Sequence, residues 1–386
     1  MNLVKTSMRS GILVVFLACL HCGAQERFVY PVPHPSGFTR RNNLIYKGIG
    51  QTGLTLDLFL PAGSVPSNRL PVFIIFNGFG GPFMRTSPQS QGWAKAATAH
   101  GFAAVTAETA PDRVAEDFDS LVAYLGRHAG EIGLDPERLV VIAWSGNVSE
   151  GLPIIQNPQR KAIKAAIIYY GSADLSQVRL DLPVLFVRAG LDQLSTNQSF
   201  DKTILAGIDA NAPWTVLNYP AGRHGFDVFD DNDLSREIIE ESFRFARLAI
   251  SDSHQSALRA GIAEASAAGA ASSGDFAQAT ALYQELVAVH PQDARLLLAY
   301  GNALTGAKKY KEARAQFNRA QSIGGLGARD LALPAAKACV LDHDPEAAMS
   351  WLKTIPPQFL PESIQSDADF STLKDRADFQ ALFRNQ

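Results

Sequence analysis

Between Leu44 and Ile250, short apolar runs alternate with amphipathic stretches, and this alternation restricts the possible folds more than any other feature of the chain. The predicted strands are Leu54–Leu60, Val72–Phe76, Ala103–Ala107, Leu139–Ala143, Ala166–Tyr170, Val184–Val187 and Thr215–Tyr219. Predicted helices between them include Gly92–His100, Arg113–Ala129 and Ser149–Ile155. Several strands are apolar throughout, which is typical of parallel strands buried on both faces. The pattern predicts an α/β fold with a mostly parallel central sheet flanked by helices, where sites gather beyond the carboxyl ends of the strands.

After Ile250 the sequence becomes rich in alanine, with helical periodicity and no predicted strand. One set of positions recurs every 34 residues: Phe276, Ala279 and Tyr283, then Tyr310, Ala313 and Phe317, then Asp344, Ala347 and Trp351. This period is typical of a helix–turn–helix repeat, in which a small residue allows close helix contact and an aromatic ring fills the gap. The segment resembles tetratricopeptide repeats, and Pro291, Gly301 and Ala320 also fit the consensus of that family.

The length of 386 residues exceeds what one hydrophobic core usually organises. We expect a signal peptide at 1–24, an α/β domain at 25–250, a linker at 251–256 and an all-α helical-repeat domain at 257–386.

The expected signal peptide has Lys5 and Arg9 before the apolar run 11–20, and small residues follow at 23–24. A basic start, a short apolar centre and a small-residue end are typical of secretion. The run is too short to span about 30 Å of hydrocarbon as a helix. We therefore expect an exported protein, periplasmic or extracellular, with no stable membrane span. An uncleaved anchor and a lipid attached to Cys19 are the alternatives.

Composition excludes several classes of partner and site. Lys and Arg total 35 against 38 Asp and Glu, so the chain lacks the basic excess with which proteins bind nucleic acid. Cys339 is the one cysteine outside the expected signal peptide, which excludes a disulfide framework and a thiolate zinc site. No His-x-x-x-His or comparable spacing predicts a metal site, and we expect no cofactor.

A serine follows the apolar strand at 139–143, in the sequence Ala-Trp-Ser-Gly-Asn at 143–147. This is a degenerate form of the G-x-S-x-G turn, in which the residues two positions from the serine are small so that strand and helix can approach. Ala143 meets that demand, and Asn147 departs from it. The candidate nucleophile is Ser145, with Ser149 as a rival inside the predicted helix.

An acid and a histidine occupy equivalent places after later strands. Asp192 follows the strand at 184–187, and His224 follows the strand at 215–219. The order Ser145, Asp192, His224, each after its own strand, is the order expected of α/β-hydrolases. Asp174 is the competing acid.

A glycine-rich loop, Asn-Gly-Phe-Gly-Gly at 77–81, follows the predicted strand at 72–76. Such a loop can direct backbone N–H groups at a negative oxygen. No Gly-Lys-Ser/Thr follows it, which argues against a nucleotide-binding P-loop. The loop is similar to the HGGG-type loop of esterases, with Asn in place of His.

Together these motifs make residues 25–250 resemble the α/β-hydrolase superfamily, and in particular its dienelactone-hydrolase-like branch. Ala-Gly-Leu-Asp at 189–192 and His-Gly-Phe at 224–226 carry the narrower resemblance. That branch commonly uses a cysteine nucleophile, whereas this chain has Ser145.

The resemblance implies a role for each candidate residue. Ser145 would be the nucleophile, His224 the general base and Asp192 the residue that orients His224. The oxyanion would be bound by the N–H of Gly146 and by that of Gly78 or Phe79. The residues expected to line an acyl pocket are Trp144, Phe83 and Phe226.

These roles imply an exported serine hydrolase that cleaves carboxylic esters or related small acyl compounds through an acyl-enzyme. Peptidase chemistry with the same triad is a variant of this prediction. The alternative is a catalytically weak or inactive hydrolase-fold scaffold, whose tetratricopeptide-like repeats hold a protein partner.

Overall fold

The computed structural model describes residues 27–32, 37–49, 52–171 and 173–384, which form two compact units. The first unit contains the described residues up to Gln177, together with Val184–Ile208 and Trp214–Ala246. The second contains Val178–Pro183, Asp209–Pro213 and the chain from Arg247 onward. The expected signal peptide at 1–24 lies outside the described residues. Within the described ranges, no helix is long and apolar enough to cross a membrane.

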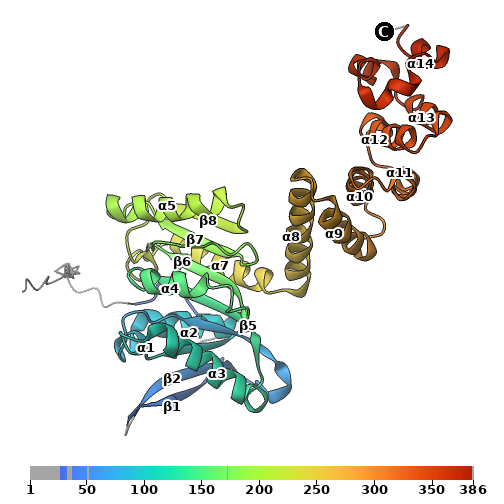
Figure 1. The fold of residues 1–386 in the computed structure, drawn as a ribbon. Helices are drawn as coiled ribbons and strands as arrows, with labels where there is room; N and C mark the ends of the chain where they lie inside the picture. The colour runs from blue at the N-terminus through green and yellow to red at the C-terminus, as the bar shows by residue number, and fades with distance from the viewer. Residues whose placement is uncertain (1–26, 33–36, 50–51, 172, 385–386) are drawn as a thin grey trace, which may run out of the picture. The chain divides into compact units, whose positions relative to one another are not determined.

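The first unit is built on one eight-stranded sheet (Figure 1). In sequence order its strands are β1 (Phe38–Ile49), β2 (Thr52–Pro61), β3 (Leu70–Ile75), β4 (Ala103–Ala107), β5 (Leu134–Trp144), β6 (Ile163–Tyr169), β7 (Val184–Ala189) and β8 (Trp214–Tyr219). Their order in space is β1-β2-β4-β3-β5-β6-β7-β8. The pairs β1–β2 and β2–β4 are antiparallel, and the remaining five pairs are parallel. The predicted mostly parallel sheet is confirmed.

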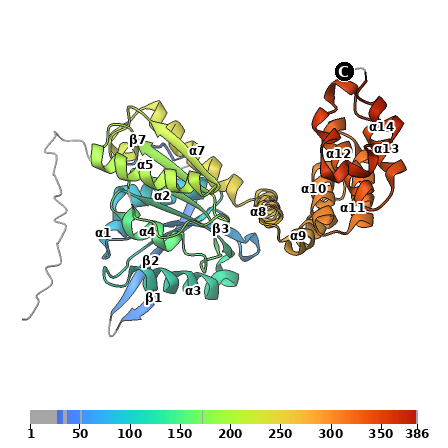
Figure 2. The same cartoon turned by 45° about the horizontal axis from the view of Figure 1, so that its top comes forward.

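Helices pack on both faces of this sheet (Figures 1 and 2). They are α1 (Phe83–Thr86), α2 (Pro88–Ala99), α3 (Val114–Ile132), α4 (Asn147–Ile155), α5 (Leu194–Asp209), α6 (Phe226–Phe229) and α7 (Asp233–Ala249). Residues 139–143 of the central strand β5 are fully buried as a result. Burial on both faces explains why this run is apolar at every position. It also gives Ser145, at the end of β5, a rigid support.

The sequence pattern does not predict β1. This strand lies at the edge of the sheet, pairs only with β2, and has two register irregularities, between Arg41 and Leu44 and between Ile45 and Lys47. Most of its side chains are exposed, so polar residues are tolerated on both faces. An edge strand of this kind lacks the apolar signal by which the other strands are recognised.

The second unit contains helices and no strand among its described residues, as the sequence predicts. The helices are α8 (Asp252–Ser272), α9 (Phe276–Val289), α10 (Ala294–Gly306), α11 (Tyr310–Ile323), α12 (Ala328–Leu341), α13 (Pro345–Leu352) and α14 (Ala377–Ala381). Short 3₁₀ helices at Pro357–Phe359, Glu362–Gln365 and Ala368–Leu373 lie between α13 and α14.

The polar segment at 251–256, expected as a linker, contains the start of α8. The Ser251 hydroxyl accepts a hydrogen bond from the His254 N–H, which satisfies one of the free donors at the helix start. A serine cap followed by an aspartate in the first turn is a helix-start signal, and it explains why this polar segment is helical.

The 34-residue repeat corresponds to helix pairs. Phe276 begins α9 and Tyr310 begins α11, so the recurring positions lie on the second helix of successive pairs. The turn before each helix has one residue in the left-handed region, Gly274 (φ 83°) and Lys308 (φ 60°). The third such residue is His343 (φ 59°), which is 35 residues further on rather than 34.

The third repeat is therefore shifted by one residue from the predicted register. Ala348 and Leu352, both fully buried, take the places predicted for Ala347 and Trp351. The extra residue lies in α12, which has 14 residues where α10 has 13. A strict 34-residue count does not detect this insertion.

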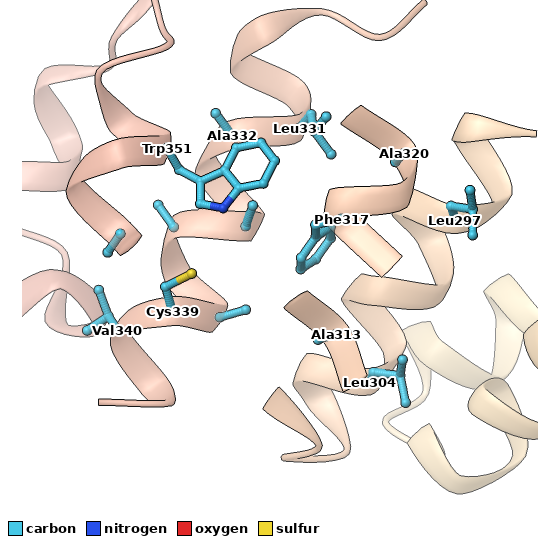
Figure 3. Close-up of a cluster of buried hydrophobic side chains, with 14 of the residues drawn as sticks. Leu297, Leu304, Ala313, Phe317, Ala320, Leu331, Ala332, Cys339, Val340 and Trp351 are labelled. Atoms are coloured by element: carbon cyan, nitrogen blue, oxygen red, sulfur yellow. The ribbon is translucent and has the colours of Figure 1, made fainter. Parts of the chain in front are cut away.

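The second unit has its own apolar core (Figure 3). Phe317 is fully buried between Ala313 and Ala320 of its own helix and α10, where Gly301 leaves space for the ring. A Cβ placed on Gly301 would lie 2.5 Å from Phe317 Cε1, so this position requires glycine. Small residues beside a large aromatic ring thus hold α10 against α11, as the repeat pattern predicts.

Candidate active site

Ser145 lies on the sharp turn between β5 and α4. Its φ of 54° is in the left-handed region, which is strained for a residue other than glycine. The Ser145 N–H donates to Tyr169 O at 3.2 Å, and its carbonyl accepts from the Val148 N–H at 3.1 Å. A Cβ on Gly171 would lie 2.2 Å from Ser145 O, so the chain after β6 passes directly against the turn. This is the geometry of a nucleophile elbow, which lifts a serine side chain above the end of a central strand.

The structure brings Ser145, His224 and Asp192 together. Ser145 Oγ lies 2.7 Å from His224 Nε2, and His224 Nδ1 lies 2.7 Å from Asp192 Oδ2. With a proton on Nδ1, the imidazole donates to the carboxylate and accepts from the serine hydroxyl. The three side chains then form one chain of hydrogen bonds that can carry a proton away from Ser145.

The Asp192 side chain is 3% exposed and the His224 side chain 45% exposed, so the chain of bonds runs from the interior to the surface. The loops that carry the two residues are bonded to each other. The Gly190 N–H donates to Tyr219 O at 2.7 Å, and the Leu191 N–H donates to Gly222 O at 2.9 Å. These backbone bonds hold the loops after β7 and β8 side by side and position the acid against the imidazole.

Neither rival residue joins this chain of hydrogen bonds. Ser149 lies in α4, and its hydroxyl donates to Gly146 O at 2.8 Å, as hydroxyls inside helices commonly do. Asp174 is exposed in the segment after β6, and His224 Nδ1 is bonded to Asp192 instead.

The glycine-rich loop differs from its expected role at one residue. The Gly78 N–H donates to Asn147 Oδ1 at 2.7 Å, so it is not free to bind an oxyanion as expected. The Phe79 N–H makes a longer bond of 3.2 Å to Asn77 Oδ1, which also accepts from the Gly80 N–H at 3.1 Å. The Gly146 N–H, at the start of α4, makes no hydrogen bond with any described residue. Gly146 and Phe79 are therefore the better pair of candidate donors.

Two of the three aromatic residues expected to line a pocket are buried in the core. Trp144 is 3% exposed, and Phe226 is completely buried against Tyr169, Tyr170 and Tyr219. The expectation is wrong for Trp144, the last residue of β5, and for Phe226, the first residue of α6, because both side chains pack into the core. Phe83 is 67% exposed and remains available to a ligand. Phe79 is also exposed and lies over the turn, where a Cβ on Gly146 would be 2.4 Å from its Cζ.

Asp227 is a buried acid beside the triad that the sequence analysis does not identify. It accepts hydrogen bonds from the Tyr170 hydroxyl, from Gln89 Nε2 at 2.8 Å and from Trp93 Nε1 at 2.8 Å. Burial raises the pKa of this carboxyl above its usual value of 3.8. The Tyr170 ring also packs against the His224 ring, with centroids 4.8 Å apart. The one sequence signal is that Asp227 directly follows His-Gly-Phe at 224–226.

A second buried network holds α1, the helix that follows the glycine-rich loop. Arg85, on α1, donates to Asp57 Oδ1 at 2.7 Å and to Glu108 Oε1 at 3.1 Å. Asp57 also accepts from Arg40 at 2.7 Å. These charges pair inside the protein and tie α1 to β1 and β2, which fixes the helix that follows the glycine-rich loop.

No group of three or more potential metal-ligating side chains occurs among the residues that the structure describes. The described groups of the site are a strained serine, a histidine, a buried acid and backbone N–H groups.

These features define an α/β-hydrolase fold in the first unit. The sheet is mostly parallel, the serine lies on a strand-to-helix turn, and the acid and the histidine follow later strands in the order Ser, Asp, His. Nothing in this geometry distinguishes the dienelactone-hydrolase-like branch, which stays a prediction.

Comparisons with known proteins match the two parts of the chain separately. A tetratricopeptide repeat family model matches residues 270–324, which extend from the end of α8 to the end of α11. No curated protein sequence matches the chain.

Three solved structures are similar to part of the chain. MGS-M1, an α/β-hydrolase enzyme from a Medee basin deep-sea metagenome library, is 16% identical, with 55% of this chain and 98% of that chain covered at a TM-score of 0.46. A bacterial heroin esterase is 14% identical, covering 57% and 87%, at a TM-score of 0.47. Esterase 2 of Thermogutta terrifontis is 18% identical, covering 55% and 91%, at a TM-score of 0.42.

Proposed function

We propose that the protein is a serine hydrolase that cleaves carboxylic esters of small acyl compounds through an acyl-enzyme. One observation carries this proposal: two hydrogen bonds of 2.7 Å join Ser145, at a strained elbow, to His224 and Asp192. An ordinary turn does not require an imidazole hydrogen-bonded to its serine hydroxyl, or a buried carboxylate hydrogen-bonded to that imidazole.

The proposed reaction uses these three side chains in sequence. Ser145 Oγ bonds to the ester carbonyl carbon while its proton passes to His224 Nε2. The imidazolium, stabilised by Asp192, then gives that proton to the leaving alcohol as its C–O bond breaks. Water repeats the two steps on the acyl-enzyme, releases the carboxylic acid and restores Ser145.

The first test is replacement of the nucleophile. Ser145→Ala should abolish turnover of p-nitrophenyl acetate and covalent labelling by a fluorophosphonate, because no other group supplies the attacking oxygen. We expect a loss of at least about 10³-fold in kcat, measured by release of p-nitrophenolate.

Ser149→Ala is the matched control, since this serine lies four residues away on α4 and bonds only to its own helix. It should keep both turnover and labelling. Equal labelling of the Ser145→Ala variant and the wild type would remove Ser145 from the mechanism.

We also propose export of the protein, periplasmic or extracellular, on the basis of the basic and apolar pattern of residues 1–24. Expression of the full sequence with N-terminal analysis of the recovered protein tests this. A mature chain that begins close to residue 25 is expected, and a retained Met1 in the exported fraction would argue for an anchor.

A second candidate function is protein binding by the repeats, which the tetratricopeptide match at 270–324 favours. A photo-crosslinker can be placed in the full-length protein at Arg295, which is exposed in α10, or at Ile45, exposed on β1. Saturable crosslinking to one partner from the first position alone would support this function. Equal crosslinking from both positions would indicate nonspecific contact.

A further inference from the structure

We propose that Asn147 is a positioning residue for the oxyanion site, and that it selects the N–H of Phe79 rather than that of Gly78 as the second donor. The inference rests on the proposed hydrolase function and deepens it. Asn147 stands where the G-x-S-x-G turn has its last glycine, so the sequence alone presents it as a defect of the motif.

The contacts of Asn147 show that its side chain is part of the loop structure. Asn147 is completely buried at the start of α4, and its Oδ1 accepts from the Gly78 N–H at 2.7 Å. Its Nδ2 lies 3.9 Å from Met84 Sδ, a weak contact with the helix after the loop. One side chain thus connects the elbow to the loop after β3.

The glycine-rich loop at 77–81 packs directly against α4, so that a side chain at position 78 would have little space. A Cβ on Gly78 would lie 3.3 Å from Asn147 Cα and 3.2 Å from Glu150 Cβ. Glycine at position 78 therefore allows the backbone to reach the asparagine, and the asparagine supplies the acceptor that this buried N–H requires.

The bond determines which N–H groups can turn toward a reacting oxygen. The Gly78 N–H is held by Asn147 and points to the side chain of α4. The Phe79 N–H shares Asn77 Oδ1 with the Gly80 N–H and makes the longer bond of the two, at 3.2 Å. A shared, long bond is the easier one to exchange for a negatively charged oxygen. Gly146, whose N–H has no described acceptor, completes the pair beneath the exposed Phe79 ring.

If Asn147 acts this way, removing its acceptor leaves the Gly78 N–H without a partner and lets the loop turn. Two variants test this: Asn147→Leu, which keeps the branched shape and the number of side-chain heavy atoms but has no acceptor, and Asn147→Gly, which restores the common motif. Both should lower kcat for p-nitrophenyl acetate by about 10- to 100-fold, which does not exceed the fall in kcat caused by removing one oxyanion donor. KM should change by no more than about threefold.

Inhibition by an alkyl trifluoromethyl ketone is a second readout, since this probe forms an adduct with Ser145 that carries the negative oxygen. Its inhibition constant should rise in parallel with the fall in kcat, which a general loss of stability would not produce. Unchanged or raised kcat in a folded Asn147→Gly protein would overturn the inference, because the freed Gly78 N–H would then serve at least as well. That variant decides the matter if Asn147→Leu does not fold.

Ser242→Ala is the matched control. Ser242 is also completely buried in the first unit. Its hydroxyl is hydrogen-bonded to Tyr169 and to Ile238 O rather than to the glycine-rich loop. It should lower stability while kcat and the inhibition constant stay within about threefold of wild type. A wild-type protein with neither turnover nor labelling at Ser145 would overturn the proposed function and this inference together, whereas an active wild type with insensitive Asn147 variants overturns the inference alone.

Discussion

At the scale of single residues, the site concentrates backbone strain beside the triad. Ser145 has φ 54° and Tyr170 has φ 25°, and each directly follows a central strand, β5 or β6. Conformations of this kind cost on the order of 1–3 kcal/mol each and persist only where the surroundings impose them. Here the Tyr170 ring packs on His224 while its hydroxyl bonds to Asp227. The strained residues thus connect the serine, the histidine and the buried acid behind them.

Asp227 leads to a prediction about pH. Because burial raises its pKa in the folded state above the usual 3.8, its protonated form is favoured by folding. Its contribution to stability is therefore complete below the unfolded value and is lost as the pH rises through the folded pKa. Relative to Asp227→Asn, the wild type should lose unfolding free energy between these two pKa values, by at most about 1.4 kcal/mol for each pH unit.

Urea unfolding of both proteins at pH 4, 5, 6 and 7 measures this difference. The amide of the variant can still accept from Gln89 and Trp93, which makes it a close match in shape and bonding. Two stability curves that run parallel over this range would show that the folded state does not raise the Asp227 pKa.

At the scale of secondary-structure elements, the two units differ in whether elements that are neighbours in the sequence are also neighbours in space. In the first unit the strands pair in an order that departs from the sequence, so β3 lies between β4 and β5. In the second unit each helix from α8 to α13 packs against its sequence neighbours, and glycines face large rings, as Gly301 faces Phe317. Local pairs of this kind give the regular spacing that the sequence shows, whereas sheet order has no such signature.

Phe317 is the element-scale test of that packing. Its ring fills the space left by Gly301 between α10 and α11, and Phe317→Ala would leave a cavity there. We expect a loss of about 3–5 kcal/mol in the unfolding free energy of the second unit, measured by the exposure of the buried Cys339 thiol in urea. Tyr310→Ala, at the half-buried start of the same helix, is the control and should cost clearly less. Similar losses for both would mean that the ring does not pack as described.

At the scale of the whole molecule, the chain has two separate apolar cores, one around the sheet and one within the helical repeats. All members of the helical-repeat core lie in the second unit. Two cores of this kind predict two separable unfolding transitions. Each transition needs its own probe, because a spectroscopic signal from the whole chain would report both at once.

Cys339 provides a probe for the second of them. It is buried in α12, and burial raises the pKa of its thiol to about 11, so it should not react with a disulfide reagent at pH 8 while its unit is folded. In a chain that starts at residue 25 it is the sole cysteine. Phe317→Ala should move the urea midpoint of thiol exposure and leave unchanged the midpoint at which the proposed hydrolase activity on p-nitrophenyl acetate is lost. Equal shifts of both midpoints would show that the two units unfold together.

The sequence alone determined those features that depend on neighbours along the chain. Apolar runs marked seven of the eight strands, and the period of 34 marked the helix pairs, because burial and helix contact both impose local patterns. The order Ser145, Asp192, His224 could also be read directly, since each of the three follows its own strand.

Only the tertiary structure decided which groups meet. The bond between Gly78 and Asn147 joins residues 69 positions apart, and it exists because β3 and β5 are neighbours in the sheet. Packing in the first unit also buries Trp144, Phe226 and Asp227. In the second unit, packing accommodates one extra residue in α12. Long-range contacts of this kind depend on strand order and on the space left by other side chains, and neither leaves a periodic trace in the sequence.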